Sequence, residues 1–440
     1  MKTKLFFELA KANGIEHSEI RISNSSSIQV ETLNGAIDSY NVSNNKSLRA
    51  RGIVNGKFGV ALTNVEDKNT AQYMVDSILA TGKYIEKEED AIIFEGSKKY
   101  VKRNIFNKKL ESTPLEEKLK HLDLIYKFIK EYDSRIENVS VSYGESSSNN
   151  LIENSYGLRL IDKSNDFYYG AFATVRAENG EVVNASEYFF DNDLSKFDPL
   201  VLAKKVASAA ISKLNPIQCK SKKYNVVLKQ KIVSTLLSAF VGSLSSEEVQ
   251  KKTSALSGKL NEQIMSKKLT VMERPTDNNI FFTNHDSEGV ATYNKTLIKK
   301  GVLQTYLYNL TTAKKDGVNS TGNGYGGVTK IGIGTTHLVI KPGKKSFDDL
   351  LQKAKNGIYL TDVMGLHAGL NPKSGDFSLQ AQGFLIEDGK LGKPLSQIVV
   401  AGNLFNLFND VIEVGSDIQL LLSSNEVPSL LIKKLQVNGN

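Results

Sequence analysis

The stretch SIQVETLNGAIDSY, residues 27–40, contains the clearest fold signal of the sequence. Two runs typical of β-strands, Ser27–Leu33 and Ala36–Tyr40, flank the dipeptide Asn34-Gly35. This dipeptide favours a two-residue hairpin, because both central residues of a type I′ turn need positive φ. The stretch therefore predicts a tight antiparallel hairpin close to the N-terminus.

Similar hairpin signals recur along the chain. Asn55-Gly56 lies within RGIVNGKFGVALT, and Asn179-Gly180 lies in the β-pattern that runs from Ile136 to Phe190. Asp388-Gly389 marks another hairpin in the second half, where Gly, Ser and Asn separate short strands. The last strand is expected over 428–437. Much of the chain is therefore predicted to form antiparallel sheet.

Helix patterns alternate with these strands. A first amphipathic face contains Ala71, Met74, Val75, Ile78 and Leu79. Thr113 is predicted to cap a second helix, with Pro114 at its first position and Glu116 completing a capping box. A third helix is expected over 198–214 and a short one over 404–411. The predicted fold class is α+β.

The chain of 440 residues is too long for one ordinary core. Pro216 and the basic run after Cys219 mark the main predicted boundary. Residues 1–218 are expected to form an α/β N-terminal region, with subdomains of about 1–85 and 112–218. Residues 219–440 are expected to form a β-rich C-terminal domain. The charged link Lys83–Glu111 is interpreted as a crossing between the two subdomains.

Composition excludes several classes of protein. The hydrophobic fraction of 40% and the charged fraction of 24% are ordinary for a globular chain. The net charge is +8, but the cations are scattered Lys pairs, which favours a solvated surface over a nucleic-acid site. A single cysteine, Cys219, allows no disulfide within the chain and no CxxC metal site. No apolar run is long enough to span a bilayer, so we expect a cytoplasmic protein without a membrane partner.

Three loops contain side chains that are common in functional sites. GNGYGG, residues 322–327, matches a nucleotide-binding pattern, but a strand-like segment follows where a helix is needed, so a flexible surface loop is expected. His285, Asp286 and Glu288 could bind a metal, although such clusters more often organise a turn. His367 lies between glycine-rich turns and is interpreted as structural, because no nucleophile or second histidine adjoins it.

The stretch LLSAFVGSLSSEE, residues 236–248, is predicted to be a buried apolar helix that ends near Gly242. Small hydroxyl residues, Ser238 and Ser243, stand where a catalytic helix would carry ligands. Whether these serines replace catalytic ligands decides whether the chain is an enzyme or the partner of an enzyme.

Several segments, in order along nearly the whole chain, resemble the TldD/PmbA family, also called the modulator of DNA gyrase family. The segments are QVETLNGAIDSYN, RARGIVNGKFGVALTN, IENSYGLRL, HDSEGVATYNKTLIKKGVLQTYLYNLTTAKKDGVNSTGN, SGDFSLQAQGFLIEDGK and PSLLIKKLQVNG. The resemblance implies an α/β N-terminal domain and a β-rich C-terminal domain. It also implies two branches. The TldD-like branch is a zinc peptidase with an H-E-x-x-x-H motif and a late cysteine ligand, and the TldE-like branch lacks the metal site and pairs with the first.

The resemblance aligns LLSAFVGSLS with LLHEAVGHGL of the active branch. Ser238 and Ser243 then replace the two histidines and Ala239 replaces the glutamate, while Gly242 is retained. Gly242 is expected to supply the flexibility that would bring two side chains five residues apart onto one ion. The segment IQLLLSSNEVPS, where the third ligand would lie, contains no cysteine. Since a serine hydroxyl is a poor zinc ligand, no catalytic residue and no metal ligand is predicted in this chain.

The resemblance implies a non-catalytic TldE/PmbA-like subunit of a cytoplasmic metallopeptidase, with zinc held by a TldD-like partner and with extended or unfolded peptides as substrates. The alternative is a stand-alone, homodimeric peptide-binding or regulatory module. Direct action on gyrase or DNA is a third hypothesis, based on the family's historical name and the basic charge. Candidate structural or cleft residues are Gly242, Asp286, Glu288, His367 and Asp376.

Overall fold

The computed structural model describes residues 3–84 and 91–439 of the chain. Residues 85–90, within the predicted charged link Lys83–Glu111, lie outside the described residues, and so does the end of the predicted subdomain 1–85. The predicted α+β class is confirmed. Within the described residues no helix is long and apolar enough to cross a membrane.

The chain forms two compact units, each built from separate stretches of sequence. The first unit comprises Met1–Ile211, Asn278–Thr292 and Tyr308–Gly332, and the second comprises Ser212–Asp277, Tyr293–Leu307 and Ile333–Asn440. Two segments from the second half of the sequence therefore belong to the first unit. The boundary at residues 218–219 stays a prediction.

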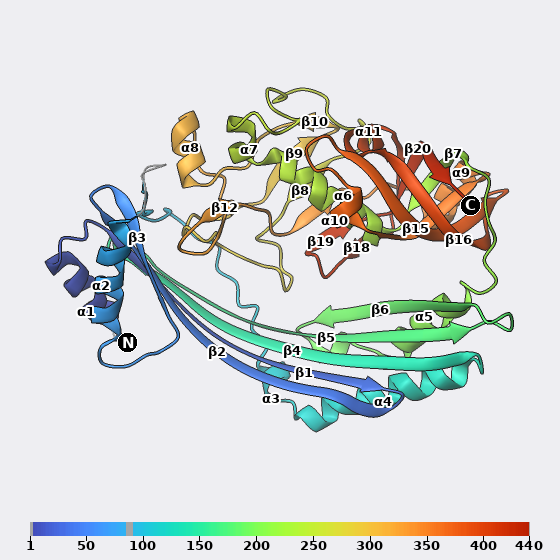
Figure 1. Ribbon diagram of the computed structural model, residues 1–440, viewed down its shortest axis with the longest axis horizontal. Helices are drawn as coiled ribbons and strands as arrows, with labels where there is room; N and C mark the ends of the chain where they lie inside the picture. Colours follow the sequence, from blue (N-terminus) through green and yellow to red (C-terminus); the bar gives the residue numbers. More distant parts are fainter. Residues whose placement is uncertain (1–2, 85–90, 440) are drawn as a thin grey trace. The chain divides into compact units, whose positions relative to one another are not determined.

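A six-stranded antiparallel sheet, in the order β3-β2-β1-β4-β5-β6, forms the centre of the first unit (Figure 1). Its strands are β1 (Ser18–Leu33), β2 (Ala36–Val54), β3 (Lys57–Thr63), β4 (Ile136–Asn154), β5 (Arg159–Arg176) and β6 (Val182–Asp191). The helices are α1 (Thr3–Ala12), α2 (Thr70–Gly82), α3 (Lys108–Ser112), α4 (Leu115–Tyr132), the 3-10 turn η1 (Leu194–Lys196), α5 (Pro199–Ile211) and α8 (Leu310–Asp316). A short β11 (Gly324–Gly326) pairs with β12 (Ile331–Ile333).

The predicted hairpins are confirmed, but at Asn179-Gly180 only Gly180 has positive φ. Asn34 and Gly35 have φ of 50° and 84°, and Asn55 and Gly56 have φ of 51° and 74°, as a type I′ turn requires. The same left-handed conformation occurs at Asp388 and Gly389. These turns fix the register, so that Leu33 pairs with Ala36 and Val54 pairs with Lys57.

The predicted cap of the second helix is wrong. The helix α4 begins at Leu115, its N-cap residue is Pro114, and no side chain caps it. The hydroxyl of Thr113 donates instead to the carbonyl of Lys109, at a distance of 2.8 Å. Thr113 therefore closes the preceding helix α3, which the charged sequence of this region did not reveal.

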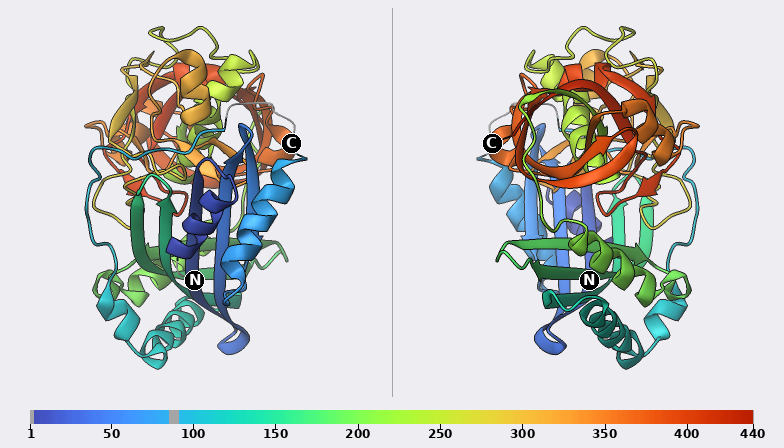
Figure 2. Two further views of the ribbon diagram at one scale, coloured as in Figure 1. Left: turned by 90° about the vertical axis from the view of Figure 1, so that its left-hand side faces the viewer. Right: turned by 90° about the vertical axis from the view of Figure 1, so that its right-hand side faces the viewer.

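The sheet of the first unit carries two separate hydrophobic cores. At one end α1 and α2 lie side by side on the strands, and a cluster that includes Phe6, Ile20, Leu48, Met74 and Ile78 is fully buried (Figure 2). At the other end α4 and α5 cover β4, β5 and β6, with Tyr143, Phe167 and Tyr169 buried beneath them (Figure 1).

Between these cores three neighbouring strands each contain a five-residue run made almost entirely of serine and asparagine. The register aligns residues 23–27 of β1 with 43–47 of β2 and with 146–150 of β4. None of these residues is buried. We call these three runs the Ser/Asn belt. It lacks the apolar side chains that a helix would need for packing, so the helices gather at the two ends of the sheet.

The second unit contains a closed ring of strands, seen end-on in the right-hand view of Figure 2. The ring is formed by β16 (Lys390–Asn403), β15 (Asp376–Glu387), β14 (Gly357–Met364), β7 (Lys222–Leu228) and β20 (Leu430–Asn438), because β16 also pairs with β20. The strand β17 (Val411–Val414) extends the sheet from β20. A second sheet orders β10 (Val302–Leu303), β9 (Lys295–Lys299), β8 (Val271–Glu273), β13 (Leu338–Ile340), β19 (Asn425–Val427) and β18 (Gln419–Leu420).

The helices of the second unit are short. They are α6 (Gln230–Val241), the 3-10 turn η2 (Gly242–Leu244), α7 (Ser246–Gln250), α9 (Phe347–Ala354), α10 (Leu366–Gly369) and α11 (Leu404–Asn409). The helix α9 covers one side of the ring with a buried cluster that contains Val227, Leu350, Leu351, Ile386 and Leu431. This core packs α9 against β7, the strand that precedes α6, and against β15 and β20.

Candidate functional site

The helix α6 contains the positions that the resemblance aligned with a metal motif. It forms because Ile232, Val233, Leu236, Leu237 and Phe240 share one buried face at helical spacing. The helix ends at Val241 with Gly242 as its C-cap, as predicted.

Gly242 does not have the conformational role expected of it. Its φ of −53° and ψ of −31° are ordinary helical values that any residue adopts. A Cβ atom at this position would meet nothing within 4 Å. Flexibility is therefore not needed here, and in this chain Gly242 is compatible with alanine.

Ser238 belongs to a network of neutral polar side chains. The amide Nδ2 of Asn425 donates to the hydroxyls of both Ser234 and Ser238, at 2.8 Å each. The hydroxyls of Ser234 and Ser423 lie 2.7 Å apart. Asn425 is only 1% exposed. We call Ser234, Ser238, Ser423 and Asn425 the Ser–Asn network. It joins α6 to the segment 418–429, in which the resemblance predicted the third ligand.

This network does not fit a catalytic zinc ion. Serine hydroxyls stay protonated at neutral pH, and an asparagine amide nitrogen that donates hydrogen bonds offers no lone pair to a metal. Ala239 cannot accept a proton. Ser243 is buried in η2, where its carbonyl accepts a hydrogen bond from Ser254. Among the residues that the structure describes, no group of three or more His, Cys, Asp or Glu side chains is placed to hold a metal.

Asp286 organises a tight turn in the first unit. One of its oxygens accepts hydrogen bonds from the backbone N–H groups of Glu288 and Val290, at 2.9 and 3.0 Å. Its other oxygen accepts from the N–H of Gly324, at 2.8 Å. The turn is completed by Gly289 with φ of 82°. The structure thus supports the turn-organising interpretation of this cluster over the metal site.

Glu288 lies beside Asp286 and is almost completely buried. Its Oε2 accepts a hydrogen bond of 2.8 Å from the backbone N–H of Leu310, at the start of α8. Burial, and then repulsion from Asp286, raise the pKa of Glu288 to about 7. Burial also raises the pKa of Asp286 to about 6, although its three backbone hydrogen bonds oppose the rise. Two carboxyl groups that titrate near neutral pH therefore share one small region.

Charged strand residues that the sequence did not single out lie near this pair. Glu19 is fully buried on β1 and its carboxylate contacts Arg21 Nη2 at 2.9 Å and Arg51 Nε at 3.2 Å. The register places Glu19 directly opposite Arg51 on β2. Arg51 in turn lowers the pKa of Glu288 by its charge, in opposition to burial. The alternate spacing of Glu19 and Arg21, which puts both on one face of a strand, was the available sequence signal.

His285 fastens the same loop to β5. Its Nε2 lies 2.6 Å from a carboxylate oxygen of Asp162, and its Nδ1 lies 2.8 Å from the backbone carbonyl of Asp286. Burial disfavours the imidazolium form, but the contact with Asp162 outweighs it and raises the pKa of His285. Both ring nitrogens are engaged with oxygen acceptors, so this histidine has a structural role.

The two remaining candidates lie in the second unit. His367 is exposed on the short helix α10. Asp376 begins β15, and its carboxylate accepts a hydrogen bond of 2.9 Å from Asn403, which helps to lower its pKa. Of the candidate residues, the structure brings together Asp286 and Glu288.

The first half of the glycine-rich segment 322–327 is not the surface loop that was expected, whereas Gly326 in its second half is exposed. Thr321, Gly322, Asn323 and Gly324 are buried. The reason is the close approach of Gly324 to Glu288, since a Cβ at Gly324 would lie 2.3 Å from a carboxylate oxygen. As expected, a strand follows this segment in place of the helix that a nucleotide site needs.

Comparison with known families gives three matches, which follow one another along the chain. Residues 18–81 match domain 1, residues 108–214 match the central domain, and residues 221–439 match the C-terminal domain of PmbA/TldA metallopeptidases. Together these matches cover most of the chain.

Individual proteins show the same similarity. A metalloprotease PmbA homologue from Buchnera aphidicola is 30% identical over 333 residues, which cover 74% of this chain and 71% of that protein. Across the first three relatives, all PmbA proteins or homologues, the match spans 71%, 66% and 63% of the relative's own length.

Two solved structures have the same fold. A proposed modulator of a DNA gyrase from Thermotoga maritima aligns with a TM-score of 0.91 and 29% identity, over 99% of each chain. TldE from Thermococcus kodakarensis aligns with a TM-score of 0.91 over 99% of this chain and 100% of that chain. At 22% identity the latter shows a likeness of fold.

Proposed function

Because the chain belongs to the PmbA/TldD metallopeptidase family, we propose that it is the non-catalytic, TldE-like subunit of a two-chain peptidase. In this proposal a second, TldD-like chain carries the H-E-x-x-x-H motif and binds the zinc ion. The complex acts in the cytoplasm on extended or unfolded peptides.

The observation that supports the proposal most strongly is the Ser–Asn network. Asn425 donates to the hydroxyls of Ser234 and Ser238, and Ser238 stands at the position that the resemblance aligned with the first histidine of the active branch. Peptide hydrolysis by zinc needs about three protein ligands and a base beside the bound water. These side chains are neutral, and none can act as that base.

The same network suggests why the helix is retained without its chemistry. Asn425 and Ser234 are buried and satisfy each other's hydrogen bonds, so they hold α6 against β19. A rigid α6 would keep the shape of the surface that meets the catalytic chain. Extended substrates would be bound through their backbone, since main-chain hydrogen bonds give affinity with little dependence on sequence.

Co-expression with an H-E-x-x-x-H-bearing paralogue from the same genome tests the proposal. The purified chain alone should contain no stoichiometric zinc and should cleave no unfolded peptide. The co-purified pair should contain zinc and should cleave such peptides. Replacement of the first motif histidine of the paralogue by alanine should abolish cleavage without separating the two chains.

Two outcomes would contradict the proposal. Stoichiometric zinc and robust cleavage by this chain alone would show that it is itself a peptidase. Recovery from native extract of a homodimer, without any motif-bearing chain, would favour the stand-alone peptide-binding module.

A further inference from the structure

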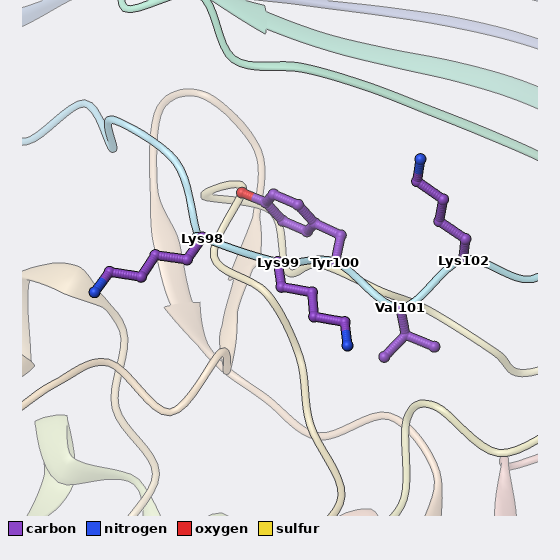
Figure 3. A pocket seen from close by; sticks show the side chains of 5 residues that line it. All are labelled: Lys98, Lys99, Tyr100, Val101 and Lys102. Carbon is purple, nitrogen blue, oxygen red and sulfur yellow. The ribbon is translucent and has the colours of Figure 1, made fainter.

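A short basic segment of the first unit, residues 98–102, lines a recess of about 640 Å³ (Figure 3). The segment, KKYVK, follows the described residues 91–97 and belongs to no helix or strand. The side chains of Lys99 and Val101 point to one side of the backbone, and those of Tyr100 and Lys102 point to the other. This alternation is that of an extended chain.

One edge of the segment is fixed to the first unit. The carbonyl of Val101 accepts a hydrogen bond of 3.1 Å from Asn284 Nδ2. The hydroxyl of Tyr100 donates to the carbonyl of Gly289 at 2.7 Å and accepts from the N–H of Ser97 at 2.8 Å. The loop that contains Asp286 and Glu288 therefore positions this segment.

The opposite edge is open. Neighbouring residues of an extended chain direct their backbone groups to opposite edges. Since the carbonyl of Val101 faces Asn284, the backbone groups of Tyr100 and Lys102 face away from it. Within residues 3–84 and 91–439, these backbone N–H and carbonyl groups have no hydrogen-bond partner. They can accept an added strand.

Among the described residues, the charges on this edge also have no partner. Lys98, Lys99 and Lys102 are exposed, and none forms an ion pair with another residue of the described ranges. Three cations thus lie within five residues, beside a recess and a free backbone edge. An acidic side chain on an added strand would find a partner at each of them.

From this geometry we infer that residues 98–102 form a docking edge for extended peptides with acidic side chains. The inference rests on the proposed function and deepens it, because it names a substrate class and the element that binds it. Backbone pairing with Tyr100 and Lys102 supplies affinity, and the three lysines select for Glu and Asp.

A single-stranded nucleic acid fits this edge less well. Binding of single strands combines cations with aromatic rings on which bases stack. The segment offers one ring, Tyr100, which is half-buried and whose hydroxyl is held by Gly289 and Ser97. A row of free backbone groups matches a peptide backbone, which presents donors and acceptors at the same spacing.

Fluorescence anisotropy with the full chain tests the inference. The probe is a labelled peptide of Glu-Glu-Thr repeats, which presents carboxylates on both faces of an extended chain. It is compared with its Gln-Gln-Thr counterpart and with the same acidic peptide N-methylated at alternate residues. The variant Lys98→Gln/Lys99→Gln/Lys102→Gln should weaken binding of the acidic peptide about tenfold, because it removes three exposed ion pairs. N-methylation should weaken it to a similar degree, because it removes backbone donors.

A matched control removes the same charge elsewhere in the first unit. Lys120→Gln/Lys127→Gln/Lys204→Gln lies on the exposed faces of α4 and α5 and should leave binding unchanged. Circular dichroism of both triple variants verifies the fold.

Three results would overturn the inference: equal binding by the two triple variants, equal binding of the Glu-Glu-Thr and Gln-Gln-Thr peptides, or full affinity for the N-methylated peptide. An oligo-dT strand that binds more tightly than the acidic peptide and competes with it would assign the edge to nucleic acid. The assay needs no catalytic partner. A negative result would therefore reject the docking edge but would not bear on the cleavage test of the two-chain complex.

Discussion

Replacing Glu288 by glutamine should change the pH dependence of stability in the first unit. The side chain is 3% exposed, and burial together with Asp286 raises its pKa from 4.5 to about 7. Between these two pH values the folded chain holds a proton that the unfolded chain has released. The free energy of unfolding therefore falls as the pH rises through this range.

The size of the effect follows from the two pKa values. Each pH unit between them corresponds to about 1.4 kcal/mol, so ionised Glu288 costs the folded state about 3 kcal/mol. Glutamine has the same shape and stays neutral, and its oxygen can accept the hydrogen bond from Leu310. We compare the free energy of unfolding of the variant with that of the wild type at each pH. Relative to the wild type, the variant should gain about 3 kcal/mol between pH 4.5 and pH 8.

Urea denaturation followed by circular dichroism at both pH values measures this double difference, in which any constant effect of the amide cancels. Glu117→Gln, on the exposed face of α4, is the matched control. A double difference below about 0.5 kcal/mol, the size typical of a surface substitution, would refute the reasoning.

Three further predictions concern the loop around Glu288 and the helix α6. Gly324→Ala should destabilise the protein by about 1–3 kcal/mol in urea denaturation, because the added methyl would lie 2.3 Å from a buried glutamate oxygen. Gly242→Ala, whose methyl would meet nothing within 4 Å, should be neutral or stabilise by up to about 1 kcal/mol. Equal effects of the two substitutions would contradict the geometry. Asn425→Ala should cost about 1–3 kcal/mol, because two serine hydroxyls lose their buried donor; an unchanged urea midpoint would exclude the network as a stabilising element. Asp162→Asn should lower the pKa of His285 in an NMR titration, since it removes the carboxylate that raises it, and an unchanged titration would count against their contact.

The turns were predictable because the chemistry of a few residues decides them. Asn34-Gly35 and Asn55-Gly56 adopt positive φ at low cost, so the hairpins followed from the dipeptides alone. The lengths of the strands were not predictable. The strand β1 begins at Ser18, although the alternating pattern was recognised only from Ser27, because serine and asparagine carry little β-propensity of their own. Pairing with β2 and β4 on either side keeps these residues in the sheet.

A helix signal was available in the second half and was missed. The helix α9 has a capping box in which Ser346 accepts a hydrogen bond from the N–H of Asp349 and Asp349 accepts one from the N–H of Ser346. The spacing of a serine and an acid three residues later is visible in the sequence.

The candidate site also has one part that the sequence predicts and another part that only the fold reveals. The resemblance alone implies that imidazole and carboxylate groups are lost at Ser238, Ala239 and Ser243. The partner of Ser238 is Asn425, 187 residues away, and only the fold shows that this amide donates a hydrogen bond to the hydroxyl of Ser238. Likewise, Asp286 and Glu288 acquire raised pKa values because the fold buries both carboxyl groups, and the hydrogen bonds from Gly324 and from Leu310 of α8 oppose this rise without cancelling it.

The Ser/Asn belt makes the six-stranded sheet one ladder with two separately packed ends. Hydrophobic side chains tie α1 and α2 to one end and α4 and α5 to the other. Through the middle the strands are joined by main-chain hydrogen bonds and by polar side-chain contacts such as that between Ser23 and Asn150. The packing at one end can therefore lose stability, or change its side chains during evolution, without a compensating change at the other end. Amide hydrogen exchange should therefore resolve the first unit into two regions of different protection, divided at residues 23–27.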